Sequence, residues 1–103
     1  MIVLGLHTAD MGCEVAIVTD DGVLACSREA MRKGQDVRLP GMVSEALSRA
    51  GLGLSEIDRI AVVTGPGSFT GVRVGLAFAT GLALAMDVPC IGITSLEAAL
   101  PAG

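Results

Sequence analysis

Residues 60–86 decide the fold, and they read IAVVTGPGSFTGVRVGLAFATGLALAM. The run Ile60–Val63 is apolar without alternation, which is typical of a strand buried on both faces of a sheet. A glycine-rich loop, Gly65–Gly71, follows it, and apolar residues then recur at helical spacing over Val72–Met86. A strand, a tight loop and a helix in this order indicate a parallel crossover connection, so we expect an α/β fold.

The segment before this stretch predicts three antiparallel strands. Ile2–Leu6 and Cys13–Thr19 are apolar runs separated by turn-forming residues, which is the pattern of a hairpin. Asp20–Gly22 is a strong tight-turn signal, because glycine supplies the positive φ that such turns need. We expect Val23–Ser27 to be the third strand.

Three further elements complete the expected order. Leu39–Ala50 has helical spacing and ends at Gly51, Val88–Ile93 is a fifth strand, and a third helix opens at Ser95. The elements follow one another as βββαβαβ(α), which predicts a mixed five-stranded sheet with helices packed on it. No repeat or linker interrupts the pattern, so residues 1–103 are expected to form one domain.

Composition excludes several classes of protein. The 103 residues are 51% hydrophobic and 2% aromatic, so aliphatic side chains fill the expected core and low-complexity disorder is excluded. Seven Lys and Arg against eleven Asp and Glu give a net charge of −4, which argues against a chain that mainly neutralises nucleic-acid phosphates. We expect no membrane span and no signal peptide. Cys13, Cys26 and Cys90 have no paired spacing, which favours a reducing cytoplasm.

The loop between the buried strand and its helix is a candidate anion site. Free backbone N–H groups at a helix start favour phosphate, and Gly67, Ser68 and Thr70 are the candidate contacts. Alternatively, the glycines serve the turn and Ser68 or Thr70 caps the helix. The loop lacks the lysine of a Walker motif.

His7 is the only histidine, and it predicts no metal site because further ligands are missing nearby.

One basic concentration stands out in an otherwise acidic chain. It comprises Arg28, Arg32, Lys33 and Arg38, with Glu29 and Asp36 between them. Such a cluster either contacts an acidic partner or an RNA backbone, or forms a solvated strand edge that deters edge-to-edge pairing.

The helix Val72–Met86 is apolar over more of its surface than one sheet contact requires. Arg73 and Thr80 mark its only wet side, so the helix has enough apolar surface for two contacts. A ridge of small residues recurs every four positions: Gly71, Gly75, Ala79 and Ala83. The ridge either admits the close approach of another helix or seats this helix on its own sheet.

Two stretches carry a resemblance to a known family. Residues 60–98, IAVVTGPGSFTGVRVGLAFATGLALAMDVPCIGITSLEA, closely resemble the N-terminal domain of the TsaB (YeaZ) family, whose signature is the GPGSFTG loop followed by a small-residue helix. The opening VLGLHTADMGCEVAIV, residues 3–18, looks like the same family's first hairpin. His7 stands where the family usually has Asp, and Gln35 where it often has His.

The resemblance implies an actin-like fold, similar to sugar kinases and Hsp70, and a non-catalytic role. Family members pair with TsaD, which transfers threonylcarbamoyl to the adenosine beside the anticodon of tRNA, giving N6-threonylcarbamoyladenosine (t6A). TsaE joins the pair and TsaC makes the threonylcarbamoyl-AMP donor. The resemblance thus implies no cofactor or metal for this chain, with ATP, Mg²⁺ and the donor used by the complex. The peptidase M22-like label attached to such proteins is not supported by any residue pattern here.

The resemblance also implies a pairing surface on the two N-terminal helices, for TsaD or a second TsaB-like chain. The implied interface residues are Leu39, Met42, Val43, Ala46, Gly71, Gly75, Phe78, Ala79 and Leu82. Family members continue into a second lobe of comparable size, so we expect residues 1–103 to be one lobe of a longer protein. The alternative hypothesis is a nucleotide-dependent phosphotransferase that uses the Gly65–Gly71 loop.

Overall fold

A computed structural model describes residues 1–8, 12–31, 34–64 and 69–93, apart from the side chains of residues 69–71. In chain order it contains β1 (Val3–His7), β2 (Gly12–Thr19), β3 (Gly22–Ala30), α1 (Gln35–Ala50), the 3-10 turn η1 (Leu54–Glu56), β4 (Arg59–Val63), α2 (Phe69–Met86) and β5 (Cys90–Ile93). The expected order of five strands and two helices is confirmed. The expected helix from Ser95 lies outside the described residues.

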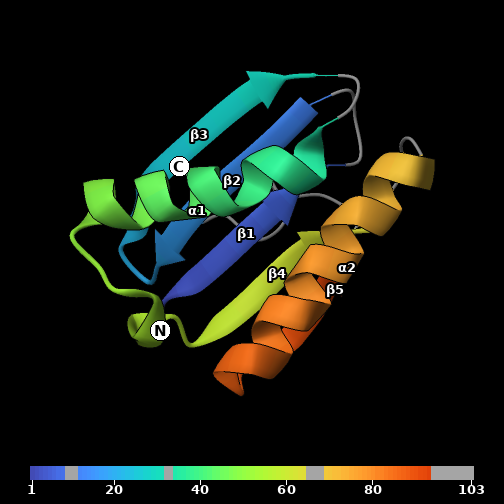
Figure 1. The fold of residues 1–103 in the computed structure, drawn as a ribbon. Helices are drawn as coiled ribbons and strands as arrows, with labels where there is room; N and C mark the ends of the chain where they lie inside the picture. Colours follow the sequence, from blue (N-terminus) through green and yellow to red (C-terminus); the bar gives the residue numbers. More distant parts are fainter. Residues whose placement is uncertain (9–11, 32–33, 65–68, 94–103) are drawn as a thin grey trace.

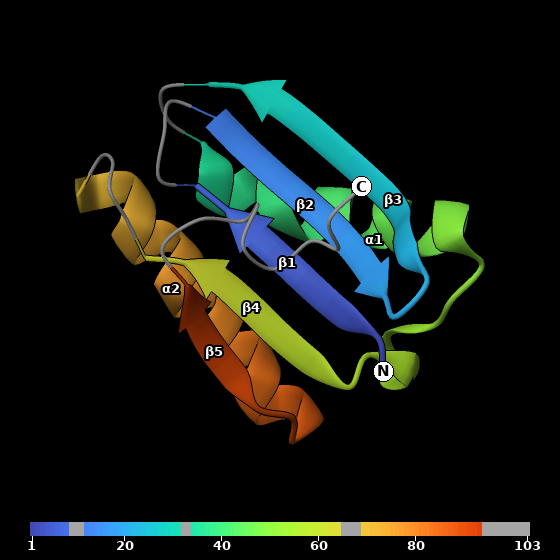
Figure 2. The ribbon, with the colours of Figure 1, turned by 180° about the vertical axis from the view of Figure 1, so that it is seen from behind.

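The strands form one mixed sheet in the order β3-β2-β1-β4-β5. β1 pairs antiparallel with β2 and parallel with β4, while β2–β3 is antiparallel and β4–β5 is parallel. Both helices lie on the same face of this sheet, in front of it in Figure 1 and behind it in Figure 2. The helix-covered face therefore holds the main core.

The main core is aliphatic, as the low aromatic content predicts. Leu4 on the central strand lies opposite Ile17 of β2 and Ile60 of β4, and none of the three is exposed. Side chains of α1 close this layer from above, among them Leu39 and Met42. Burial of this apolar surface is the main favourable term in folding.

Strand β4 is buried on both sides, as its unbroken apolar run predicts. Ile60 and Val62 belong to the main core, and the alternating residues Ala61 and Val63 are 4% and 1% exposed. Val63 joins a second small cluster with Ala16 and Val18.

Helix α1 ends as predicted and begins earlier than predicted. Gly51 is left-handed (φ 71°), and the following N–H of Leu52 donates to the Leu47 carbonyl at 3.0 Å, which closes the last turn. The helix begins at Gln35 rather than Leu39, because Pro40 is accommodated inside it and Asp36 stands in the first turn, where the helix dipole favours a carboxylate.

Three other boundaries differ from expectation by two or more residues. Helix α2 begins at Phe69 rather than Val72. The sequence predicts a strand over Val88–Ile93, but β5 begins at Cys90. Asp87 and Val88 instead terminate α2: Asp87 is left-handed (φ 57°), and the Val88 N–H donates to the Ala83 carbonyl at 3.0 Å. Strand β3 runs on from Ser27 to Ala30, since the ladder with β2 continues through the charged residues of this edge.

Candidate partner-docking surface

An apolar groove separates α1 from α2 on the helix-covered face. One part of it, along α1, is a hollow of about 500 Å³. Pro40, Val43, Ser44, Leu47, Ser48, Leu52, Leu54, Phe78 and Leu82 line it. The two serines are the polar members of this set, so the hollow offers a mainly apolar surface.

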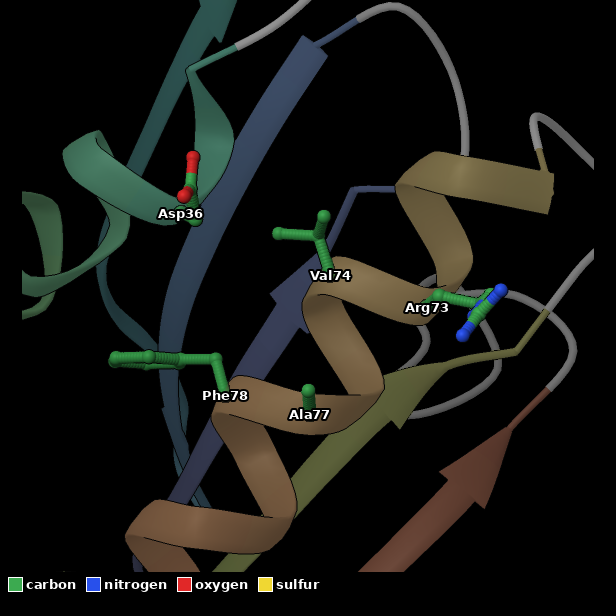
Figure 3. Close-up of a pocket in the computed structure, with 5 residues that line it drawn as sticks. All are labelled: Asp36, Arg73, Val74, Ala77 and Phe78. Atoms are coloured by element: carbon green, nitrogen blue, oxygen red, sulfur yellow. The ribbon is translucent and has the colours of Figure 1, made fainter.

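A second hollow, of about 610 Å³, continues the groove towards the first turn of α1. Asp36, Arg73, Val74, Ala77 and Phe78 line it. Figure 3 shows that Val74 and Phe78 project from α2 towards α1, while Arg73 points to the opposite side of α2. Phe78 belongs to both hollows, and it is therefore the centre of the groove.

The predicted interface residues fall into two groups in the structure. Phe78, Leu82 and Val43 line the groove. The others that the structure describes are buried inside the chain itself: Leu39, Met42, Ala46 and Ala79 are not exposed at all, and Gly75 is buried too. Their apolar spacing reflects contact with the chain's own sheet, which a sequence pattern cannot separate from contact with a partner. The side chain position of Gly71 lies outside the described residues.

The predicted small-residue ridge on α2 seats the helix on its own sheet. A Cβ added at Gly75 would collide with Thr8 Oγ1 and lie 3.6 Å from Val62 Cγ2. Ala79 and Ala83 continue this buried side, at 0% and 4% exposure. Of the two interpretations of the ridge, close seating on the sheet is the one that the packing supports.

A different small-residue ridge faces outwards. Ala77, Gly81 and Ala85 recur every four residues on α2, and all three are exposed. A Cβ at Gly81 would meet nothing within 4 Å, so packing within the chain does not require glycine there. Sequence reasoning missed this ridge, although a glycine inside a helix, which costs about 1 kcal/mol relative to alanine, was a visible signal.

Helix α1 is fixed to the sheet edge by an arginine between two carboxylates. Arg38 donates from Nη2 to Glu29 of β3 at 2.6 Å and to Glu45 of α1 at 2.9 Å. These hydrogen bonds raise the pKa of Arg38, and the bond from Arg38 holds the pKa of Glu29 below its ordinary value. Arg38 is therefore engaged within the chain.

The rest of the predicted basic cluster is not gathered into one patch by the described residues. Arg28 is 76% exposed, with Nε 3.9 Å from Glu14 Oε2. Arg32 and Lys33 lie outside the described residues. For these residues the two alternatives, contact with an acidic partner or an RNA backbone and a solvated strand edge, stay open.

The departures from the family pattern lie at the ends of two elements. His7 ends β1, and its Nδ1 is 3.6 Å from Glu14 Oε1 on the neighbouring strand. Gln35 is the first residue of α1 and is 7% exposed.

The candidate anion contacts Gly67, Ser68 and Thr70 lie where the structure describes no side chain. Within the described residues, no group of three or more His, Cys, Asp or Glu is placed to hold a metal ion.

The three cysteines are free thiols in different surroundings. Cys13 is 1% exposed, and burial, followed by the charge of Glu29, raises its pKa to about 11. Cys26 and Cys90 are exposed on the edge strands β3 and β5, and partial burial raises the pKa of each.

In the part of the chain that is described, no helix is long and apolar enough to cross a membrane.

Comparisons of the sequence give a consistent set of relatives. The family model for TsaD, tRNA N6-adenosine threonylcarbamoyltransferase, matches residues 28–103. The tRNA threonylcarbamoyladenosine biosynthesis protein TsaB of Escherichia coli (strain K12) is 38% identical over 96 residues, which cover 93% of this chain and 41% of the relative. TsaB of Haemophilus influenzae is 40% identical over 98 residues, with 95% and 41% covered. The chain thus spans about two-fifths of the curated relatives it matches.

The fold has close counterparts among solved structures. YeaZ from Pseudomonas aeruginosa superposes with a TM-score of 0.85 at 35% identity, over 92% of this chain and 44% of that one. RuvC from Thermus thermophilus superposes at 0.63 with 17% identity over 90% of this chain and 63% of that one, a likeness of fold alone. The architecture is the α/β, actin-like type expected from the sequence. The chain therefore belongs to the family that the TsaD model describes, and it is similar to the TsaB (YeaZ) proteins.

Proposed function

We propose that this chain is one lobe of a non-catalytic partner subunit in the synthesis of t6A in tRNA, and that it pairs with TsaD. The support is its relation to TsaB proteins, whose name states that biosynthetic role. The observation that carries the pairing is the apolar groove centred on Phe78.

The proposal includes the wider assembly expected from the family. TsaE joins the pair, a second copy of the chain occupies the same surface when TsaD is absent, and tRNA is reached through the complex. ATP, Mg²⁺ and threonylcarbamoyl-AMP are used by the complex rather than by this chain. The setting is the cytoplasm, where the three thiols stay reduced.

The groove has the features of a helix-docking surface. Its floor is aliphatic, and Phe78 offers an aromatic side chain at the centre, the kind of residue that dominates binding energy in interfaces. An amphipathic helix that fills such a groove buries apolar surface on both partners. Two hollows that share one residue accommodate successive side chains on one face of that helix.

The outer ridge of α2 adds a reason for close approach. Ala77, Gly81 and Ala85 place almost no side-chain bulk between the α2 backbone and a neighbour. Small residues at a helix crossing shorten the distance between the helix axes. Gly81 thus has a role in pairing that it lacks within the chain.

The test measures binding of purified TsaD to three variants. Phe78→Asp places a charge at the centre of the groove and is expected to abolish binding. Gly81→Leu adds bulk to the outer ridge in open space, so it is expected to weaken binding at least tenfold while the chain stays folded. Val23→Asp is the control, because Val23 is 47% exposed on strand β3, at the edge of the sheet away from α2.

A folded Gly81→Leu variant that binds TsaD as tightly as the unchanged chain would show that the pairing surface lies elsewhere. Loss of binding in Val23→Asp alone would place the surface at the opposite sheet edge. Circular dichroism of each variant separates loss of binding from loss of folding, which matters most for the half-buried Phe78.

A further inference from the structure

From the charge distribution along the groove we infer that the helix docking there carries a lysine or arginine opposite Asp36. This inference rests on the proposed function and names the chemistry of its partner. Asp36 lines the hollow next to the first turn of α1, together with apolar residues of α2. A mainly apolar groove thus has an acidic group at one end.

The Asp36 carboxylate has no partner among the described residues. It is exposed, and no hydrogen bond or ion pair to a residue of the described ranges involves it. Two arginines of the described ranges, Arg73 and Arg38, are directed elsewhere. Arg73 lines the same hollow, but its side chain points to the far side of α2 in Figure 3, and Arg38 is held by Glu29 and Glu45.

Docking changes the environment of this carboxylate. A helix that fills the groove and covers Val74 and Phe78 also removes water from around Asp36. Taking a carboxylate out of water without a partner is unfavourable, whereas an opposing cation offsets that loss and selects the orientation of the incoming helix. A guanidinium or ammonium at the corresponding end of the partner helix satisfies this requirement.

A second role for Asp36 lies within the chain. Asp36 stands in the first turn of α1, where its negative charge interacts favourably with the helix dipole. This interaction is present whether or not a partner is bound. The dipole role predicts a change in the stability of the free chain. The pairing role predicts a change in binding that depends on salt, so the two are separable by experiment.

The experiment compares TsaD binding by Asp36→Asn and by the unchanged chain at about 0.01 M and about 0.5 M salt, because salt screens exposed charge pairs. Asp36→Asn is expected to weaken binding about two- to fivefold at low salt and to make little difference at high salt. Asp36→Lys, which opposes like charges, is expected to weaken binding about tenfold at low salt. Asp21→Asn is the matched control, since it removes the same charge from the β2–β3 turn.

Three outcomes overturn the inference. One is an Asp36→Asn variant that binds as tightly as the unchanged chain at low salt. Another is a loss of the same size at both salt concentrations, and the third is tighter binding by Asp36→Lys, which would place an acidic group opposite this position. If the unchanged chain binds no TsaD, the proposed function fails as well, whereas tight binding that ignores position 36 removes only this inference.

Discussion

Two glycines six residues apart on α2 have opposite surroundings. Gly75 faces Thr8 and Val62 on the sheet, and its missing side chain is what lets the helix lie so close. Gly81 faces open space. Packing within the chain therefore requires glycine at position 75 but does not explain the glycine at position 81.

Alanine at each position is expected to change the free energy of unfolding in opposite directions. Gly75→Ala forces Thr8 or the helix to move, so it is expected to lower the free energy of unfolding by about 1–3 kcal/mol, as overpacking does. Gly81→Ala is expected to raise the free energy of unfolding by up to about 1 kcal/mol, because alanine has a higher helix propensity than glycine. Urea denaturation of both variants checks this pair, and a stable Gly75→Ala chain would contradict the close seating of α2.

The cysteines are expected to react with alkylating reagents in a fixed order. At a pH near the ordinary thiol pKa of about 8.5, Cys26 and Cys90 become labelled in the folded chain because they are exposed. Cys13 is protected by burial and by its pKa of about 11, so it is labelled only after unfolding. Mass spectrometry of peptides locates the label, and rapid labelling of Cys13 in the folded chain would contradict its place in the core.

At the scale of elements, α1 has one face in the core and one in water. Leu39 is fully buried and Val37, two residues earlier, is 81% exposed. Leu39→Ala is expected to lower the free energy of unfolding by about 2–5 kcal/mol through a cavity, and Val37→Ala by no more than about 0.5 kcal/mol. Thermal or urea denaturation measures both, and similar losses in the two variants would mean that α1 is rotated from the position described here.

The contact between α1 and β3 is expected to make stability depend on pH. Glu29 has a lowered pKa in the folded chain because Arg38 hydrogen-bonds its carboxylate, so its contribution is complete above the ordinary pKa of 4.5 and is lost as the pH falls through the lower folded value. Glu29→Gln removes that part of the acid sensitivity. Denaturation midpoints between neutral and acidic pH test this, and an unchanged pH profile in Glu29→Gln would contradict it.

The sequence predicted the elements better than their ends or faces. The C-terminus of α1 at Gly51 could be read directly, because glycine adopts the left-handed turn. The start of β5 could not, since Asp87 takes a left-handed conformation that is uncommon for residues other than glycine. Helix α2 has two ridges of small residues, one containing Gly75 and the other containing Gly81, and the sequence does not show which of them packs on the sheet. The contact of Thr8 with the Gly75 position identifies the first ridge as the one on the sheet.

At the scale of the whole molecule, the sequence indicated that α2 has more apolar surface than its sheet contact requires. It did not show which residues of α2 remain available to a partner. Leu39 and Ala79 were expected on the docking surface because apolar spacing looks the same for a core and for an interface. Phe78 and Leu82, which were predicted as interface residues, line the groove. Asp36 could not be found from sequence, since its importance follows from how α1 and α2 sit relative to each other.

The central claim is that the face between α1 and α2 binds a partner, and the solution mass of the chain tests it most directly. Light scattering of the 10.4 kDa chain, alone and then mixed with TsaD, measures this. The account predicts a dimer that gives way to a complex of one chain with one TsaD. A monomer whose mass stays the same when TsaD is added would contradict it.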